Sequence, residues 1–344
     1  MSSRQVTVRV AAMVVIVVAA LAVPFVASAF HTGIATRMAI FALFGLAFNV
    51  VFGAGGMPSL GHAAFFGVGG YIVGIGSLRY GLGFGTILVL ALLVGGLLGI
   101  VMGLLTLRTQ GVYLLLLTLA IGQAVWGLAF QQVRLTGGDN GLAGISRGLL
   151  PIGGQNVATF HWAVVVLVVC FAVLLWWFQR SPAGIAIVAH RESASRLAAL
   201  GYRVGAYRVS AFAVSGAVSA VAGVLYAMSN RFVGPENLAW QTSAEVMLLA
   251  IVGGATYFAG PIIGAILLVG LETFAIGFTD RWVSILGLTY ILSMLFLPDG
   301  VLGLIDRLSH RGRHDGDAAA DPSQVAGQPT VAAASTDVEP TVPL

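Results

Sequence analysis

The chain has 344 residues, of which 58% are hydrophobic and 9% are charged, and its mean hydropathy is +0.96. Because a soluble domain usually carries about 25% charged residues, this composition excludes a water-soluble fold. The formal net charge is +4, and the 17 residues counted as lysine or arginine are all arginines, since no lysine occurs. The single cysteine, Cys170, excludes an intramolecular disulfide, and we expect it to be buried as a small apolar residue.

Apolar runs near the length needed to cross about 30 Å of hydrocarbon as a helix recur along the chain. In chain order they cover residues 10–29, 34–52, 61–77, 84–105, 112–130, 162–178, 209–228, 244–254, 262–278 and 283–297. The strand alternation of a barrel is absent, so we predict an all-α, polytopic transmembrane helical bundle of about 10 (8–10) helices. The run 244–254 is short for a crossing, and we expect a broken or half helix there.

The first apolar run allows two interpretations. Arg4 and Arg9 precede it and Ala29 ends it within an Ala-Ser-Ala sequence, a pattern that also resembles a cleaved signal peptide. We prefer an uncleaved first helix. Ten crossings that start inside leave eleven arginines in the cytoplasm and six outside, which favours an N-in and C-in topology.

This layout divides the chain into parts. Residues 1–9 form a cytoplasmic N-terminus, and residues 10–305 form the transmembrane domain. The longest connections are an external loop at 131–161 and a cytoplasmic loop at 179–208. Residues 306–344, rich in Ala, Pro, Ser, Thr and Asp, are predicted to be a disordered cytoplasmic tail.

Glycine is abundant, with 46 residues, and many lie inside the apolar runs, as do Gly95, Gly96, Gly99 and Gly103. Close contact between helices explains such glycines. Membrane helices also tolerate glycine without any such contact. The sequence leaves both explanations open.

The absence of lysine bears on the source of energy. A nucleotide-binding loop of the form G-x-x-x-x-G-K-[ST] needs its lysine to reach the phosphates, so this chain cannot contain one. Three alternatives remain: another polypeptide hydrolyses the nucleotide, an ion gradient drives transport, or the protein is a passive pore.

The loop 179–208 carries the signals of a helix. Ser181 and Pro182 suit its start, and Leu200 and Gly201 suit its end, so we predict one docking helix between them. The loop also holds five arginines against one glutamate. An ordinary basic loop held at the anionic leaflet is the alternative interpretation.

A family resemblance then adds to these patterns. The loop resembles the ATPase-docking loop of branched-chain amino acid ABC transporter permeases, specifically the second of the two paired permeases, at Gly184, Ala189, Arg191, Glu192, Leu200 and Gly201. Blocks at 49–71, 107–120 and 136–142 resemble further family motifs. Glycines and prolines near the end of the chain agree in order, namely Gly253, Gly254, Gly260, Pro261, Gly264, Pro298, Gly300 and Gly303.

The resemblance covers roughly residues 34–304 and implies a helical permease of the bacterial inner membrane that works by alternating access. It implies four kinds of partner: a paired homologous permease, two cytoplasmic ATP-binding subunits, a periplasmic or lipid-anchored solute-binding protein, and membrane lipid. It implies no enzyme activity, no cofactor, because ATP is bound by the partner subunits, no metal and no nucleic acid. The solutes would be branched-chain amino acids or related small amino-acid-like molecules.

Three other functions stay open. One is an ABC permease for urea or amides, and another is an ATP-independent secondary transporter or channel. The third, a polytopic membrane enzyme, is disfavoured because the six histidines are scattered and do not group with acids or nucleophiles.

The chain departs from the family pattern at a few positions. Met57-Pro58 replaces a polar residue and an apolar one before the block at 59–67, which bears on the solute. In the docking loop, Ile185 and Val188 replace basic residues and Ala194 replaces an acidic one. We therefore expect the fit to the ATPase to be specialised.

Polar residues inside the apolar segments are candidates for the translocation path. Asn49 and His62, together with Ser59 and Gly61, flank a glycine-rich break where polar groups could line a path. The alternative for His62, which we favour, is a buried residue that hydrogen-bonds a neighbouring helix.

Two acidic residues, Glu245 and Glu272, lie deepest in the apolar runs. A carboxylate there is costly, so it is a functional candidate and could meet a substrate ammonium. We favour the alternative that each pairs with an interfacial arginine such as Arg231 or Arg281.

One external segment is rich in turn-forming residues: Thr136, Gly137, Gly138, Asp139 and Asn140. It could form a gate or a contact for the binding protein, or it could be a simple glycine-rich connector.

Overall fold

The computed structural model describes residues 3–150, 155–278, 281–296 and 299–304, so the predicted tail at 306–344 and Pro298 lie outside the described residues. The helices are α1 (Ser3–Val26), α2 (Ala29–Asn49), α3 (His62–Tyr80), α4 (Phe84–Leu105), α5 (Gly111–Gln131), α6 (Val133–Thr136), α7 (Val157–Arg180), α8 (Pro182–Glu192), α9 (Ala194–Ala199), α10 (Val204–Asn230), α11 (Trp240–Gly253), α12 (Gly260–Phe278) and α13 (Trp282–Phe296). A π-helical turn at Val50–Ala54 continues α2.

The predicted all-α bundle is confirmed. Among the described residues, six helices are long and apolar enough to cross a membrane: Ala29–Ala54, Phe84–Leu105, Gly111–Gln131, Val157–Arg180, Val204–Asn230 and Gly260–Phe278. Two other predicted crossings correspond to α11 and α13, which have 14 and 15 residues. Both are shorter than the roughly 20 residues that a straight crossing needs, so the half helix expected near 244–254 is present as α11.

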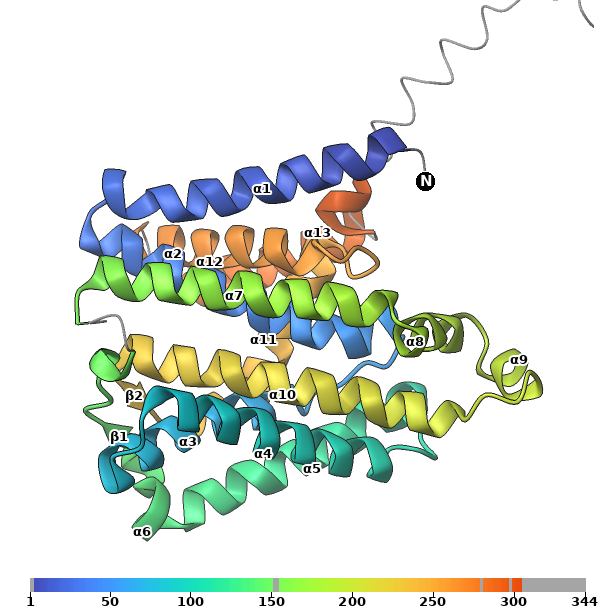
Figure 1. The fold of residues 1–344 in the computed structure, drawn as a ribbon, viewed down its shortest axis with the longest axis horizontal. Helices are drawn as coiled ribbons and strands as arrows, with labels where there is room; N and C mark the ends of the chain where they lie inside the picture. The colour runs from blue at the N-terminus through green and yellow to red at the C-terminus, as the bar shows by residue number, and fades with distance from the viewer. Residues whose placement is uncertain (1–2, 151–154, 279–280, 297–298, 305–344) are drawn as a thin grey trace, which may run out of the picture. The chain divides into compact units, whose positions relative to one another are not determined.

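Helix α10 lies at the centre of the bundle and packs against α2, α3 and α4 (Figure 1). Close approach to α4 depends on glycine, because a Cβ at Gly99 would lie 2.3 Å from the carbonyl oxygen of Phe212. Gly95 and Gly103 also face α10, whereas a Cβ at Gly96 would meet nothing closer than 3.7 Å. Close contact between helices therefore explains Gly95, Gly99 and Gly103, whereas Gly96 is a glycine that a membrane helix tolerates without such contact.

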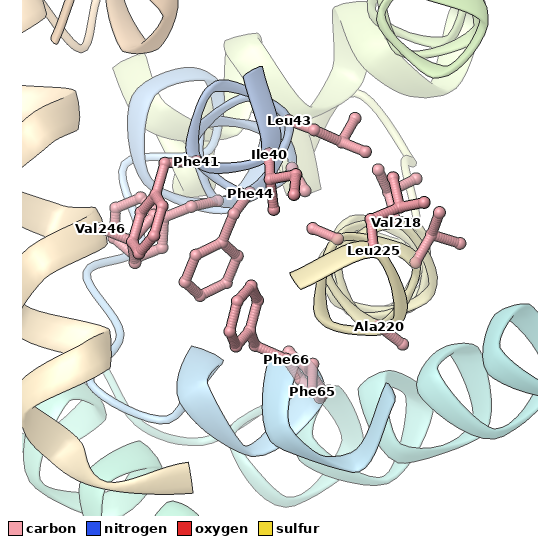
Figure 2. Packing of buried hydrophobic residues seen from close by; sticks show 14 of the residues in the cluster. Ile40, Phe41, Leu43, Phe44, Phe65, Phe66, Val218, Ala220, Leu225 and Val246 are labelled. Atoms are coloured by element: carbon pink, nitrogen blue, oxygen red, sulfur yellow. The ribbon is translucent and has the colours of Figure 1, made fainter. Parts of the chain in front are cut away.

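Aromatic and aliphatic side chains fill the space between α2, α3, α10 and α11 (Figure 2). Phe44 of α2 and Phe66 of α3 are buried with their ring centroids 4.6 Å apart. Val246 of α11 and Leu225 of α10 are also fully buried. In a bilayer, such packing contacts replace the hydrophobic driving force that helices have in water.

Helix α1 is held against α7 by hydrogen bonds to two of its own backbone carbonyl oxygens, near Pro24. Pro24 has no N–H, so it cannot bond the carbonyl oxygen of Ala20 four residues earlier. His161 Nε2 of α7 donates to that oxygen at 2.9 Å, and Trp162 Nε1 donates to the carbonyl oxygen of Leu21 at 3.1 Å. The first predicted helix thus packs as a member of the bundle.

The two ends of the bundle differ (Figure 1). At one end β1 (Leu142–Ala143) pairs antiparallel with β2 (Phe232–Val233), with Leu142 opposite Val233. Helices α8 and α9 project at the other end. Along α7, between these ends, Cys170 is exposed, so the expectation that it is buried was wrong. Its side chain lies on the outward face of the helix.

Candidate functional site

The docking loop begins as the sequence predicted. Ser181 caps α8, because its Oγ accepts a hydrogen bond from the backbone N–H of Gly184 at 3.3 Å, and Pro182 occupies the first turn. The prediction of one docking helix was wrong, because Ser193 ends α8 and its Oγ caps α9 by accepting from the N–H of Arg196. Helix α9 ends at Leu200 and Gly201, whose φ of 83° is left-handed.

The other side of the loop is anchored to α4. Arg208, near the start of α10, is only 4% exposed and donates from Nη2 to the carbonyl oxygens of Thr106 and Thr109, both at 2.8 Å. Its Nη1 donates to the carbonyl oxygen of Leu107 at 3.1 Å. A cation at these carbonyls, which have no helical partner, complements the negative end of the α4 dipole.

One face of α8 is turned outward. Ile185 and Val188 are 62% and 42% exposed, and Glu192 is exposed on the same stripe of the helix. Ala189 and His190 are half-buried. Two of the positions where the chain departs from the family pattern therefore lie on the accessible face.

The inward side of α8 reaches the break that follows α2. Arg191 Nη1 donates to the carbonyl oxygen of Gly53, within the π-helical turn, at 2.7 Å. The chain passes so close that a Cβ at Gly56 would lie 2.7 Å from Cγ of Arg191. Ile187 is 2% exposed and packs beside Gly55. Helix α8 is thus joined directly to this break.

The same break contacts the connection between α11 and α12. Asn49 is 3% exposed, and its Nδ2 donates to the carbonyl oxygen of Tyr257 at 3.3 Å. A Cβ at Gly53 would lie 2.0 Å from the carbonyl oxygen of Ala255. The π-helical turn after α2 and the connection between α11 and α12, far apart in the sequence, therefore lie against each other beside α8.

His62 lies in a directed hydrogen-bond network and is fully buried. Ser215 Oγ donates to the carbonyl oxygen of Ala47 at 2.6 Å, so it must accept from His62 Nε2, 2.9 Å away. His62 Nδ1 then accepts from Ser59 Oγ at 2.9 Å if the ring is neutral. The histidine thus joins α3 to α10 and, through Ser215, to α2.

Two more hydrogen bonds tie the start of α3 to its neighbours. The N–H of Leu60 donates to Thr118 Oγ1 of α5 at 3.1 Å, and the N–H of Ala63 donates to Ser243 Oγ of α11 at 2.7 Å. Gly61 lies so close to α5 that a Cβ there would be 2.5 Å from the carbonyl oxygen of Thr118. We call residues 59–63 and their partners on the four neighbouring helices the α3 hub.

The two membrane carboxylates share one cation. Arg37 of α2 lies 2.9 Å from Glu272 of α12 and 4.0 Å from Glu245 of α11. Pairing with arginine was the favoured interpretation, but the partner is Arg37 and neither of the arginines that we named. The group ties α2 to α11 and α12, and it holds one more carboxylate than cation.

The turn-rich segment at 136–140 folds back on itself before β1. Thr136 Oγ1 donates to the carbonyl oxygen of Ala129 at 2.6 Å and accepts from the N–H of Gly138 at 3.2 Å. Gly137 and Gly138 have positive φ values of 79° and 58°. Asp139 and Asn140 are exposed at the turn. The glycines are needed by the backbone, whereas the two polar side chains are free for contact.

Comparison with known proteins supplies the family. Residues 30–297 match the family model described as branched-chain amino acid transport system / permease component. The chain belongs to this family. This permease is 31% identical over 314 residues to the high-affinity branched-chain amino acid transport system permease protein LivM of Salmonella typhimurium, across 84% of this chain and 74% of that protein, and the same values apply to LivM of Escherichia coli.

The other comparisons extend this result. A protein of Methanocaldococcus jannaschii described as "Probable branched-chain amino acid transport permease protein LivM" is 26% identical to the permease, across 75% of this chain and 88% of that protein. No solved structure matches the chain significantly. The permease is a subunit of an ABC importer and a multi-pass protein of the inner membrane.

Sequence reasoning missed four residues that the structure places in these contacts. Arg37 is an ionisable residue inside a predicted crossing of the permease, and that alone marks a functional candidate. Ser215 and Thr118 are small hydroxyl residues within apolar runs and Ser243 directly precedes one, so their side chains must find a partner on another helix. The signal was present for all four, but their partners depend on the fold.

Proposed function

We propose that this permease imports branched-chain amino acids or related small amino-acid-like solutes by alternating access, driven by ATP hydrolysis in separate cytoplasmic subunits. The observation that carries the proposal is the hydrogen bond from Arg191 to Gly53, at 2.7 Å. Because α8 is bonded to the backbone of the break after α2, a force on α8 reaches a membrane helix through one direct contact.

From this break, movement passes to a second gate element. Asn49 holds the carbonyl oxygen of Tyr257, and Gly53 lies against Ala255. The π-helical turn and the connection between α11 and α12 then move together, and they form the cytoplasmic gate. Broken helices near a permeation path are common in transporters because their free backbone groups can face a cavity.

The outward face of α8 is the surface for an ATP-binding subunit. Ile185 and Val188 make it apolar, and Glu192 supplies one charge at its end. We infer that the partner presents an apolar groove with a basic residue at its rim. Two such subunits, a paired homologous permease and a solute-binding protein complete the transporter, and Asp139 and Asn140 are the proposed contact with the binding protein.

The proposed topology has ten crossings, with both termini in the cytoplasm. Its support is that the start of α1 lies at the same end of the bundle as α8 and α9, while β1 and β2 lie at the opposite end (Figure 1). In this layout residues 10–305 form the transmembrane domain, 179–208 the cytoplasmic docking loop and 131–161 the external loop.

The solute path is proposed to run beside α11 and α12. Glu245 has one third of its side-chain surface exposed, and Arg37 lies closer to Glu272 than to Glu245. The Glu245 carboxylate is therefore the group best placed to meet the ammonium of an amino acid. His62, which is fully buried, has a supporting role through the α3 hub.

The test uses Arg191→Glu in the full transporter, assembled with its partner subunits in proteoliposomes. We expect ATP hydrolysis to continue while uptake of radiolabelled leucine falls about tenfold, since loss of a hydrogen bond from a charged group costs at least about 1.4 kcal/mol. Arg196→Glu is the matched control, because Arg196 is exposed on α9 and its side chain makes no hydrogen bond or ion pair to any residue that the structure describes.

Two results would count against the proposal. Equal uptake in the Arg191 and Arg196 variants would show that the contact with Gly53 carries no force. Leucine uptake by the purified permease alone, without ATP-binding subunits, would instead favour a secondary transporter or channel.

A further inference from the structure

A cavity of about 590 Å³ lies between α3, α4 and α5, next to α6. Its walls are almost entirely apolar, with Ile72 on α3, Val94 on α4 and Val125 on α5 among them. Cavities that hold small organic molecules have volumes of about 300–1,000 Å³. The space is therefore large enough for a ligand and apolar enough for a hydrocarbon chain.

The cavity is open at the outer surface of the bundle. Leu128, which lines it from α5, is 61% exposed, and Leu90 and Val94 of α4 are partly exposed at its edge. Both helices are long and apolar enough to cross the membrane. A molecule dissolved in the bilayer can therefore enter without passing through water.

One polar group in the cavity has no partner. Tyr71 lines the cavity, is 6% exposed, and its hydroxyl makes no hydrogen bond to any described residue. A buried tyrosine hydroxyl usually finds a partner. A ligand with an oxygen atom beside an apolar chain would supply one.

Two arginines flank the end of the cavity near α6. Arg79 adjoins the lining residue Tyr80, and Arg134 adjoins the lining residue Leu135. Arg79 Nη2 donates to the backbone carbonyl oxygen of Arg134, which brings the Arg79 guanidinium beside the backbone of α6. Among the described residues, no carboxylate lies within ion-pair distance of either arginine. Their charge is available to an anion.

We propose that this cavity binds an anionic phospholipid, with one acyl chain between α3, α4 and α5 and the phosphate at Arg79 and Arg134. The Tyr71 hydroxyl donates to an oxygen of the lipid. Basic pockets between membrane helices select anionic headgroups by this combination of charge and apolar surface. The two arginines without acidic partners favour a phosphate over the apolar side chains of a second permease.

The test titrates the full-length permease, purified in a mild detergent, with phosphatidylglycerol and with phosphatidylcholine of the same chains, read by native mass spectrometry. We expect the protein to retain phosphatidylglycerol preferentially. The double variant Arg79→Gln, Arg134→Gln should bind it about 30-fold more weakly, given the usual contribution of each basic residue at a membrane surface. Arg108→Gln, an exposed arginine at the end of α4, is the matched control and should bind normally.

A second variant separates binding of the acyl chain from binding of the phosphate. Ala129→Phe fills the cavity while both arginines remain, and it should weaken binding of both lipids. If Ala129→Phe does not give a monodisperse protein, Tyr71→Phe replaces it and should weaken phosphatidylglycerol binding.

Three outcomes would overturn the proposal. One is unchanged lipid binding in the arginine and cavity variants. Another is binding of glycerol phosphate as tight as that of phosphatidylglycerol, which would indicate a plain anion site in which the cavity has no role. The third is normal lipid binding by Ala129→Phe together with loss of the second permease when this variant is co-purified with it, which would make this face a subunit interface.

Discussion

Replacing Gly99 by alanine tests whether close contact between α4 and α10 holds the centre of the bundle together. The new Cβ would lie 2.3 Å from the carbonyl oxygen of Phe212 and 2.8 Å from Cα of Ala213. Both neighbours are backbone atoms, so no side chain can rotate away and the helices must separate. Overpacking of this kind lowers the free energy of unfolding by about 1–3 kcal/mol. The better helix propensity of alanine offsets about 1 kcal/mol of this loss.

Gly96→Ala is the matched control, three residues earlier on the same helix. Its Cβ would meet only the carbonyl oxygen of Ala213 and Cβ of Ala217, both at 3.7 Å, which is ordinary contact. Here the helix propensity acts alone, so this variant should gain about 0.5–1 kcal/mol. The two substitutions are chemically identical and should shift stability in opposite directions.

The assay is the midpoint of thermal unfolding of the purified permease in detergent, followed by tryptophan fluorescence. We expect a lower midpoint for Gly99→Ala than for the wild type, and an equal or higher midpoint for Gly96→Ala. A Gly99→Ala protein at least as stable as the wild type would refute the argument that this glycine is needed for close approach.

Three further predictions concern buried polar groups. Glu272→Gln should lower the free energy of unfolding by about 1–3 kcal/mol, as measured by thermal unfolding. This loss is smaller than for a fully buried ion pair, because the side chain of Arg37 is 32% exposed. Normal leucine uptake by this variant would exclude a substrate role for Glu272. Ser215→Ala leaves the buried His62 Nε2 without a partner, so it should cost about 1–3 kcal/mol, and an unchanged unfolding midpoint would contradict the network. Burial, and then the charge of Arg208, lower the pKa of His190, so the unfolded chain binds its proton more readily. The stability that the folded protein gains by keeping His190 neutral is fully present above about pH 6.5 and is lost as the pH falls. In the His190→Asn variant, the unfolding midpoint should therefore change less between about pH 7 and pH 5 than in the wild type.

The local features of the fold could be predicted where their causes are local. Ser181 and Pro182 start α8 because a cap and a fixed φ act within one turn, and Gly201 ends the following helix for the same reason. The break at Ser193 was missed, although serine is a strong cap, because the small residues between Ser181 and Gly201 favoured one continuous helix.

Contacts between distant segments could not be predicted in the same way. Arg37 pairs with Glu272, 235 residues away, and although Arg37 lies inside a predicted crossing, nothing in the sequence identifies Glu272 as its partner. The contact between Arg191 and Gly53 depends on a π-helical turn, whose extra residue leaves no periodic signal. The exposure of Cys170 depends on which face of α7 meets the bundle.

The α3 hub has a mechanical consequence. Its hydrogen bonds reach α5, α10 and α11 from the first residues of α3, and Ser215 carries the network on to α2. If one of these helices slid along its axis by a residue, about 1.5 Å, at least one donor would lose its acceptor in a place without water. Tilting about the hub leaves the bonds intact. The hydrogen bonds therefore favour rotation of the helices about the hub over sliding, and in such a rotation the displacement of each residue grows with its distance from the hub.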